Sequence, residues 1–166
     1  MSSFLLLLSV LMALTAVFSI PFACTKHNIQ FDVIPLQDAR KFNKMKPGMQ
    51  RDYLINKYLD GYDQKRMKAQ GWTIAFKGFN SNMTCMNDFA YREGKTYTCE
   101  GEPVLCANGF HACLLPKDVS SYYFDGGNKY HIVFLKDVRH RLNGDSKVCA
   151  KTIKIGPRID HRYITE

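Results

Sequence analysis

The sequence predicts an α+β domain in which a basic helical N-terminal segment precedes a mixed, mainly antiparallel sheet with one embedded helix, supported by disulfides. Apolar residues recur at helical spacing within residues 24–70, which also carry most of the net positive charge. Residues 71–166 instead contain short β-prone runs separated by glycine turns, which is typical of a sheet-rich segment. Because the chain has 166 residues and six cysteines, we expect one secreted, disulfide-supported domain over residues 24–166.

The first residues of the chain determine the expected compartment. Residues 4–20 are almost wholly apolar, and no charged side chain precedes Lys26. Small residues at Ser19 and Ala23 suit a cleavage site. We therefore expect residues 1–23 to be a signal peptide and the protein to be secreted into the extracellular space. The alternative is a membrane anchor, but the apolar run is near the shortest length that spans a bilayer, so no transmembrane segment is expected in the mature chain.

Cysteines and a glycosylation sequon fit the same secretory route. In an oxidising compartment the cysteines are expected to form disulfides, and all pairings stay open because spacing does not select among them. The cysteines are Cys24, Cys85, Cys99, Cys106, Cys113 and Cys149. Asn82 begins the sequon Asn82-Met83-Thr84, so it is expected to carry a glycan if the host is a eukaryote.

Two helices are predicted in the N-terminal segment, after irregular structure over residues 24–46. Pro47 is suited to start the first helix, whose apolar side chains share one face. This face consists of Met49, Tyr53, Leu54 and Tyr58. The second, shorter helix is predicted to reach Gln70, and Gly71 suits its C-terminal cap.

The sheet-rich segment shows short β-prone runs and one helix start. Strands are predicted at residues 72–79, 95–99, 103–106, 130–135 and 148–155. The run at 130–135 is continuously apolar, which predicts burial on both of its faces. Pro116 is placed to begin the embedded helix, which is predicted to end near Tyr123.

Positive charge is concentrated in the N-terminal third of a chain whose formal net charge is +8. Between Cys24 and Lys77 there are eleven Lys and Arg against five Asp, and the rest has twelve against ten acidic residues. This excess favours an acidic surface or an unknown protein as partner, and its simpler explanation is a solvated helical face. Nucleic acid is not the expected partner, because the pattern offers almost no exposed aromatic residues beside cations.

Histidines and cysteines suggest two further kinds of chemistry. His111 lies near Cys106 and Cys113, and such residues can hold zinc. Their spacing matches no standard zinc motif, and thiols pair with one another in an oxidising compartment, so no metal is expected. A secreted basic protein with five histidines also fits a ribonuclease-like nucleic-acid binder, although spacing places no two histidines together.

Four blocks of residues stand in a fixed order between Ile74 and Ile155. They are Phe76-Lys77-Gly78-Phe79, Gly94-Lys95-Thr96-Tyr97, Cys106-x-x-Gly109-Phe110-His111-Ala112-Cys113, and Pro116-x-Asp118-Val119 with Tyr122-Tyr123. The blocks K-G-F, G-K-T-Y and C-x-x-G-F-H-A-C-x-x-P-x-D-V-x-x-Y-Y resemble an uncharacterised domain family best known from phages and bacteria. The resemblance implies no stated activity. It also implies counterparts for three of the cysteines, whereas Cys24, Cys99 and Cys149 are additions in this chain.

The order of the blocks is more distantly similar to that of ADP-ribosyltransferases. In these enzymes an aromatic-basic-Gly strand precedes a strand with Ser-Thr-Ser, and a later strand carries a catalytic glutamate. Lys77 would match the basic position, and the stretch His111-Ala112-Cys113 would match Ser-Thr-Ser. However, residues 129–138 and 147–155 contain no glutamate that could stabilise an oxocarbenium-like transition state.

The leading hypothesis is a secreted, soluble interaction protein, effector-like or toxin-like, that is not an enzyme and needs no cofactor. The alternative is an ADP-ribosyltransferase-like enzyme that uses NAD. Its candidate catalytic residues are Lys77, Tyr97, His111 and Tyr123. A ribonuclease-like binder is the third hypothesis.

Overall fold

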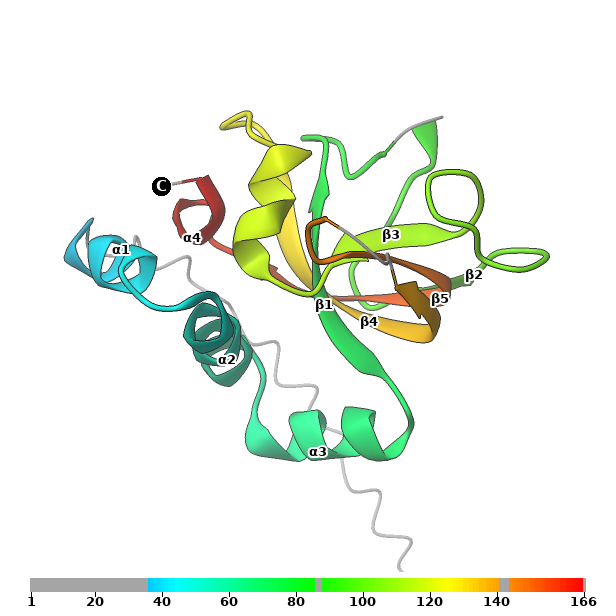
Figure 1. Ribbon diagram of the computed structural model, residues 1–166, viewed down its shortest axis with the longest axis horizontal. Helices are drawn as coiled ribbons and strands as arrows, with labels where there is room; N and C mark the ends of the chain where they lie inside the picture. The colour runs from blue at the N-terminus through cyan, green and yellow to red at the C-terminus, as the bar shows by residue number, and fades with distance from the viewer. Residues whose placement is uncertain (1–35, 86–87, 141–143, 166) are drawn as a thin grey trace, which may run out of the picture. The chain divides into compact units, whose positions relative to one another are not determined.

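The computed structural model describes residues 36–85, 88–140 and 144–165. The predicted signal peptide and Cys24 lie outside these residues. The helices of the described part are α1 (Leu36–Asn43), α2 (Pro47–Tyr58), α3 (Gly61–Ala69), the 3₁₀-helix η2 (Pro116–Ser121) and α4 (Arg162–Thr165) (Figure 1). The strands are β1 (Thr73–Phe79), β2 (Thr96–Thr98), β3 (Phe110–Cys113), β4 (Lys129–His140) and β5 (Lys147–Ile159).

Both predicted N-terminal helices are present. Pro47 occupies the first turn of α2, where its missing N–H leaves no backbone acceptor unpaired. The Asp60 side chain caps α3 by accepting a hydrogen bond of 2.7 Å from the backbone N–H of Asp63. The chain leaves α3 through Gly71, whose φ of +75° favours glycine. Pro47 and Gly71 therefore mark these helix ends as the sequence indicated, and Asp60 adds a cap that the sequence analysis did not predict.

Two details of the predicted helical segment are wrong. Irregular structure was expected before residue 47, but Ala39 and Phe42 on α1 are fully buried, because packing stabilises a helix whose local pattern is weak. Met49 was expected on the apolar face of α2 and is 58% exposed. Gln50 is buried in its place, since its Nε2 donates to the backbone oxygen of Phe42 at 3.1 Å.

The strands form a closed antiparallel barrel. Their order is β2-β5-β3-β1-β4, and β4 pairs with β5 in turn, which closes the ring. β2 and β3 occupy successive stretches of the same edge of β5, at Thr152–Lys154 and Lys147–Ala150. Every pairing among the strands that the structure describes is antiparallel. The mainly antiparallel character that the sequence predicted is therefore present, and no parallel pair is found among these strands.

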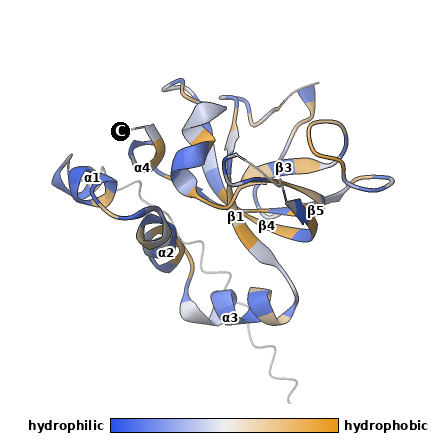
Figure 2. Cartoon of the chain, viewed as in Figure 1, coloured by the Kyte–Doolittle hydropathy of each residue, from blue (hydrophilic) through white to orange (hydrophobic). Residues whose placement is uncertain are grey.

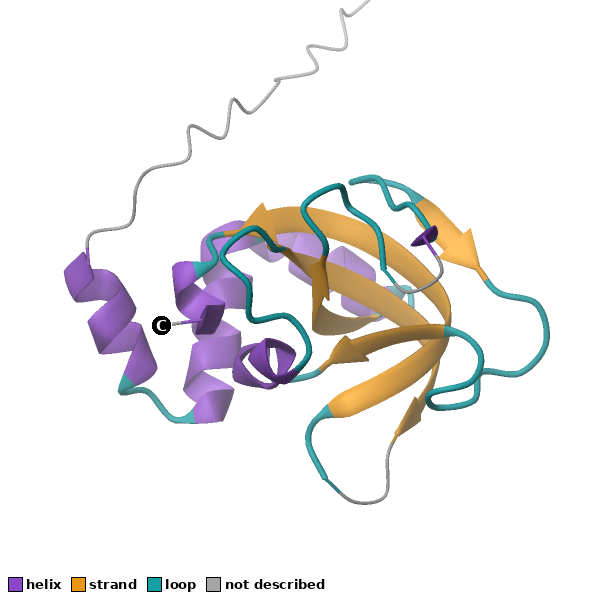
Figure 3. Ribbon diagram, turned by 90° about the horizontal axis from the view of Figure 1, so that it is seen from above, coloured by secondary structure: helices purple, strands orange, loops and turns teal. Residues whose placement is uncertain are grey.

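Two hydrophobic clusters lie on opposite faces of the barrel wall. Alternate residues of β1 separate them, because Ala75 and Phe79 belong to the interior cluster and Phe76 to the exterior one. Side chains from α1, α2 and α4 cover the exterior cluster, and the helices gather on one side of the strands (Figure 3). Strand segments are mostly apolar, whereas α3 is strongly hydrophilic (Figure 2). The barrel therefore has a packed interior and a second core beneath its helices.

Two other predicted elements differ from the structure, and one is confirmed. Residues 103–106 form no strand, because Val104 pairs instead with Asn108 across a tight turn. The helix at Pro116 is of the 3₁₀ type and ends at Ser121. The run at residues 130–135 is buried throughout, as its continuous apolar character predicted.

The described cysteines are free thiols, and no disulfide joins them in the structure. They are Cys85, Cys99, Cys106, Cys113 and Cys149. The predicted disulfides therefore stay a proposal. Within residues 36–85, 88–140 and 144–165, no helix has the length and apolar character needed to cross a bilayer.

Candidate functional site

β1 and β3 separate soon after they meet. They pair at Phe76 and Cys113, and continuation of that register would place Gly78 opposite His111. The pairing of β1 with β3 stops before that point, although β1 remains paired with β4 along its whole length. A cavity of about 1010 Å³ opens at this seam, lined by both strands, by the end of η2 and by the loop before β3. Cys85, Asp88, Phe89 and Tyr91 complete its lining.

Lys77 bridges the seam with its side chain. Its Nζ donates a hydrogen bond of 2.8 Å to the backbone oxygen of His111. The same nitrogen lies 5.4 Å from the ring centre of Phe79 and 5.7 Å from that of Tyr91, distances that suit cation–π attraction. Only 8% of Lys77 is exposed. A buried ammonium group therefore lies on one side of two adjacent aromatic rings, of which that of Tyr91 lines the cavity.

His111 lines the same cavity and is held as a neutral imidazole. Its Nε2 accepts a hydrogen bond of 2.8 Å from the backbone N–H of Cys106, so the other ring nitrogen, Nδ1, carries the proton. Burial lowers the pKa of His111 to about 4, and the positive charges of Lys147 and Lys77 act in the same direction. At neutral pH His111 can donate one hydrogen bond from Nδ1, and it is no proton acceptor at Nε2.

Gly78 allows an aromatic ring to pack directly on the backbone of β1. A Cβ atom at this position would overlap the ring of Tyr123, so any other residue would push the ring away. The Tyr123 hydroxyl donates to Cys85 Sγ at 3.2 Å, and burial raises the pKa of this phenol. Tyr123 and Cys85 thus form one fixed wall of the cavity.

Lys147 contributes a second cation to the cavity. Its Nζ lies 4.3 Å from the ring centre of Tyr122 and 3.7 Å from Cys106 Sγ. Asp88 is a carboxylate of the lining. Its single negative charge stands against the two ammonium groups of Lys77 and Lys147, so the lining is positive on balance.

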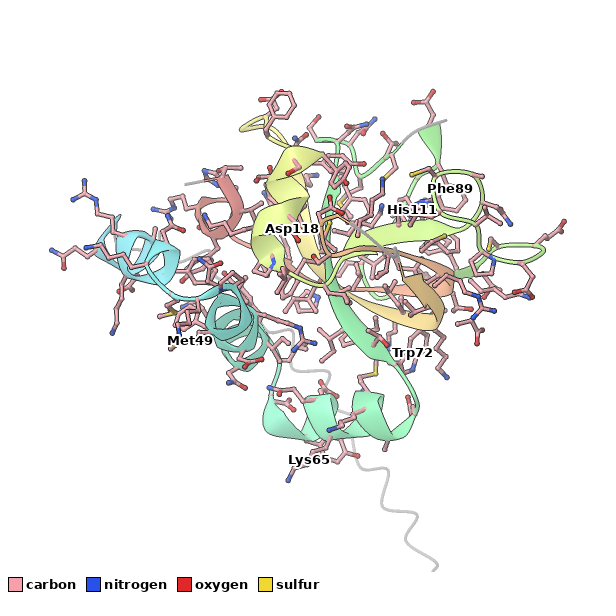
Figure 4. All side chains as sticks on the ribbon, in the orientation of Figure 1. Met49, Lys65, Trp72, Phe89, His111 and Asp118 are labelled. Carbon is pink, nitrogen blue, oxygen red and sulfur yellow. The ribbon has the colours of Figure 1, made fainter. Side chains whose placement is uncertain are left out.

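Edge-to-face aromatic rings form the remaining wall. The ring centre of Phe89 lies 4.8 Å from that of Tyr91 and 6.0 Å from that of Phe110. Phe89 is 45% exposed and lines the cavity. Phe89 and His111 lie at the same end of the barrel, far from Lys65 on α3 (Figure 4). The cavity therefore offers the apolar faces and edges of aromatic rings beside its cations.

The structure brings together three of the four predicted site residues. Lys77, His111 and Tyr123 line the cavity, and Tyr97 does not. Tyr97 packs 5.3 Å from Tyr91, ring centre to ring centre, and its hydroxyl accepts a hydrogen bond of 2.9 Å from the backbone N–H of Arg92. Tyr97 therefore packs against Tyr91 of the cavity lining without lining the cavity itself.

The prediction missed Lys147 and Phe89 as cavity residues. Lys147 directly precedes a predicted strand, and a cation at the end of a strand is by itself only a weak indication of a binding site. Phe89 follows the cysteine-containing loop without a periodic pattern, so nothing local distinguished it. Both reach the cavity only because distant segments pair around the barrel.

The second histidine of the barrel is structural. His131 is 2% exposed, and its Nδ1 lies 2.9 Å from the backbone oxygen of Gly156, while its Nε2 has no partner. Burial lowers its pKa to about 4, against the opposing effect of the hydrogen bond to Gly156. In the part of the chain that is described, no three His, Cys, Asp or Glu residues are grouped to hold a metal ion.

The fold and cavity define a small antiparallel barrel domain with helices on one side and a positively charged, aromatic pocket at a seam in its wall. Over residues 73–165, more than half of its length, the chain matches the domain of unknown function DUF7666, and it belongs to this family. This confirms the expected membership of an uncharacterised domain family. No curated protein and no solved structure is detectably similar to the chain.

Proposed function

We propose that this chain is a secreted, non-enzymatic binding protein whose cavity takes a small anionic ligand with a flat apolar part. The observation that supports this most directly is the buried ammonium group of Lys77, which lies beside two adjacent aromatic rings in the cavity wall. Secretion rests on the predicted signal peptide at residues 1–23. Within this proposal the domain acts by capturing a ligand rather than by changing it.

The charge of the lining supports an anion. An ammonium group has three N–H donors, and the contact with His111 accounts for one of those of Lys77. Lys147 lies on the neighbouring strand of the same cavity. In a partly buried site such charges attract an anion more strongly than they would in open water.

The aromatic wall supports a ligand with a flat apolar part. Phe89, Tyr122 and Tyr123 line the cavity, and Phe89 and Tyr122 are 45% and 39% exposed. Large apolar rings that stay accessible to solvent beside polar groups are typical of small-molecule sites. The cavity of about 1010 Å³ is at the upper end of the volumes that such ligands occupy, about 300–1,000 Å³.

The state of His111 favours binding over acid–base catalysis. A general base near neutral pH needs a free nitrogen and a pKa near that pH. In His111 the Nε2 atom already accepts a hydrogen bond, and the pKa is about 4. A ribonuclease with two working histidines is therefore not the proposal that these contacts support.

The ADP-ribosyltransferase alternative has one observation in its favour. Lys77 and His111 line one cavity, as a nucleotide-binding enzyme would require. Against it, β4 and β5 contain no glutamate, and Asp88 lies outside the barrel strands. NAD is therefore included in the test as the ligand of this alternative.

The basic N-terminal helices support a second contact, with an acidic surface. Lys65 and Lys68 on α3 are exposed, and much of this helix is hydrophilic (Figure 2). An acidic protein partner would be attracted there by long-range charge, independently of the cavity.

Isothermal titration calorimetry with phenyl phosphate tests the cavity proposal. Phenyl phosphate should bind, and the neutral analogue benzyl alcohol should bind at least about tenfold more weakly, since a hydrogen bond to a charged group contributes about 1.5–3 kcal/mol. Lys77→Met and Lys147→Met should each weaken phenyl phosphate by a similar factor. Equal affinities for the charged and neutral probes would overturn the proposal.

A matched control separates the cavity from general charge. Lys65→Met removes the same charge from exposed α3 and should leave the affinity for phenyl phosphate unchanged. An equal loss in this variant would show attraction to the whole basic chain instead. Binding of NAD followed by release of nicotinamide would instead support the ADP-ribosyltransferase alternative over the binding-protein proposal.

A further inference from the structure

Lys77 and Lys147 reach the cavity from opposite faces of the barrel wall. Ala75 and Phe79 belong to the interior cluster, so Lys77, which lies between them on β1, also begins on the interior face. Val148 belongs to the same cluster, so its neighbour Lys147 on β5 points to the exterior face. The lining of the cavity includes members of both the interior and the exterior cluster. The cavity therefore passes through the wall at the seam, with Lys77 on its interior side and Lys147 on its exterior side.

Both cations are held close to His111. The Nζ atom of Lys77 lies 2.8 Å from the backbone oxygen of His111. The Nζ atom of Lys147 lies 3.7 Å from Cys106 Sγ, and the backbone N–H of Cys106 donates to His111 Nε2 at 2.8 Å. Burial lowers the pKa of His111, and the positive charges of Lys147 and Lys77 lower it further. The two ammonium groups therefore lie near one imidazole, although they come from different faces of the wall.

The charges of the two lysines are not balanced by carboxylates bonded to them. None of the ion pairs in the part of the chain that the structure describes involves Lys77 or Lys147. Lys77 is almost wholly buried, where a charge without a counter-charge is costly. Asp88 lines the cavity but is exposed, so water and salt screen its charge. An anion with two negative charges would therefore balance the seam better than an anion with one.

The placement of the donors on two sides also selects the shape of the anion. A carboxylate accepts hydrogen bonds through two oxygens that lie in one plane. A phosphate monoester has three acceptor oxygens and carries a charge of about −1.5 to −2 at neutral pH. Its tetrahedral phosphorus directs these oxygens to different sides, so that donors on opposite faces of the wall can bind it at once. Both the shape and the charge therefore favour a phosphate monoester over a carboxylate.

We propose that the ligand is a small aromatic phosphate monoester in its dianionic form, whose phosphate group lies in the seam between Lys77 on the interior side and Lys147 on the exterior side. This inference rests on the proposed function, in which the cavity takes an anion with a flat apolar part, and it adds the chemical class of that anion. The rings of Phe89 and Tyr122, which line the cavity and are partly exposed, contact the aromatic part of the ester. No bond of the ester is broken.

Isothermal titration calorimetry of the full chain with three aromatic anions tests the class. At about pH 8 phenyl phosphate is a dianion, because its second pKa is about 6. Phenyl sulfate has three terminal oxygens in the same arrangement but a single negative charge, and benzoate has a planar carboxylate. Phenyl phosphate should bind at least about tenfold more tightly than either monoanion. An equal affinity for phenyl sulfate or benzoate would overturn this inference alone, whereas anions that bind no better than benzyl alcohol would overturn the proposed function as well.

The pH dependence of binding separates the charge of the anion from its shape. Between about pH 8 and about pH 5 phenyl phosphate gains a proton, so its affinity should fall about fivefold. Phenyl sulfate keeps one charge over this range, and its affinity should stay unchanged. A fall of the same size for both probes would show that the protein titrates instead, and would contradict the inference.

One substitution and its matched control assign the preference to Lys147. Because Lys147 is only half-buried, Lys147→Met should fold, which circular dichroism verifies. In this variant the preference for phenyl phosphate over phenyl sulfate should shrink from about tenfold to less than about threefold. Lys151→Met removes the same charge from the same strand, β5, outside the cavity lining, and should keep the preference. A preference unchanged in Lys147→Met, or lost equally in both variants, would contradict the inference.

Discussion

The side-chain nitrogen of Lys77 lies 2.8 Å from the backbone oxygen of His111, across the point where β1 and β3 stop pairing. A charged side chain there takes the place of a backbone donor. The contact closes the barrel wall while leaving an ammonium group at the cavity surface. Under the proposed function, one residue therefore couples the stability of the seam to the binding of an anion.

Lys77→Met should destabilise the fold as well as weaken binding. The substitution keeps most of the side-chain volume and removes the donor, so the buried His111 oxygen loses its partner at a cost of about 1–3 kcal/mol. Urea denaturation followed by circular dichroism measures the change. Lys65→Met on exposed α3 should change the free energy of unfolding by less than about 0.5 kcal/mol. Equal stabilities of the two variants would contradict a structural contact at the seam.

Gly78→Ala should be destabilising because of one ring. The new Cβ atom would overlap Tyr123, and forced repacking of this kind costs about 1–3 kcal/mol. In a Tyr123→Ala background the same substitution should be nearly neutral, so a double-mutant cycle should show a positive coupling. Gly126→Ala is the control, because nothing lies within 4 Å of a Cβ there. Additive effects of the two changes would show that the ring does not require Gly78.

Stability should fall as the pH drops from about 6.5 to about 4. Burial lowers the pKa of His131 to about 4, so below its ordinary pKa the unfolded chain binds a proton that the folded chain does not. The loss is at most about 3 kcal/mol for this residue. His131→Asn keeps a donor for Gly156 and should reduce the slope of the stability profile between these pH values, as measured by chemical denaturation. His111, whose pKa is also lowered to about 4, contributes to the remaining slope. An unchanged profile would mean that other groups cause the acid sensitivity.

The sequon at Asn82 should be used if the chain is made in a eukaryotic secretory pathway. Asn82 is exposed, and its Oδ1 accepts a hydrogen bond of 2.7 Å from the Thr84 hydroxyl. Thr84→Ser keeps that hydroxyl and should retain the glycan, whereas Thr84→Ala should lose it. Electrophoretic mobility before and after glycosidase treatment measures the glycan. A glycan on Thr84→Ala, or none on the parent chain, would contradict the assignment.

Local patterns predicted the elements that local physics determines. The proline at Pro47, the glycine at Gly71 and the apolar run at 130–135 each act within a few residues, and the structure contains the elements that they indicated. α1 was missed because Phe42 is buried by Tyr163, 4.8 Å away between ring centres, and that partner comes from the other end of the chain. No local window contains both residues.

The candidate site was predicted in part for the same reason. Lys77 and His111 stood out within their own blocks of sequence, and both line the cavity. Their meeting depends on a single strand pairing, Phe76 with Cys113, which periodicity does not encode. Lys147 joins them only through the pairing of β3 with β5. A closed barrel brings together residues that are far apart in sequence, so its cavity follows from non-local register.

We propose that the seam between β1 and β3 binds an anion with a flat apolar part. Nuclear magnetic resonance can locate a bound probe on the chain and so test this binding site. Phenyl phosphate is titrated into the ¹⁵N-labelled full chain while the backbone amide signals are recorded. Shifts should concentrate at Lys77, Phe89, His111 and Tyr123, and in Lys77→Met about tenfold more probe should be needed for the same shifts. Shifts confined to α2 and α3, or no shifts at millimolar probe, would contradict it.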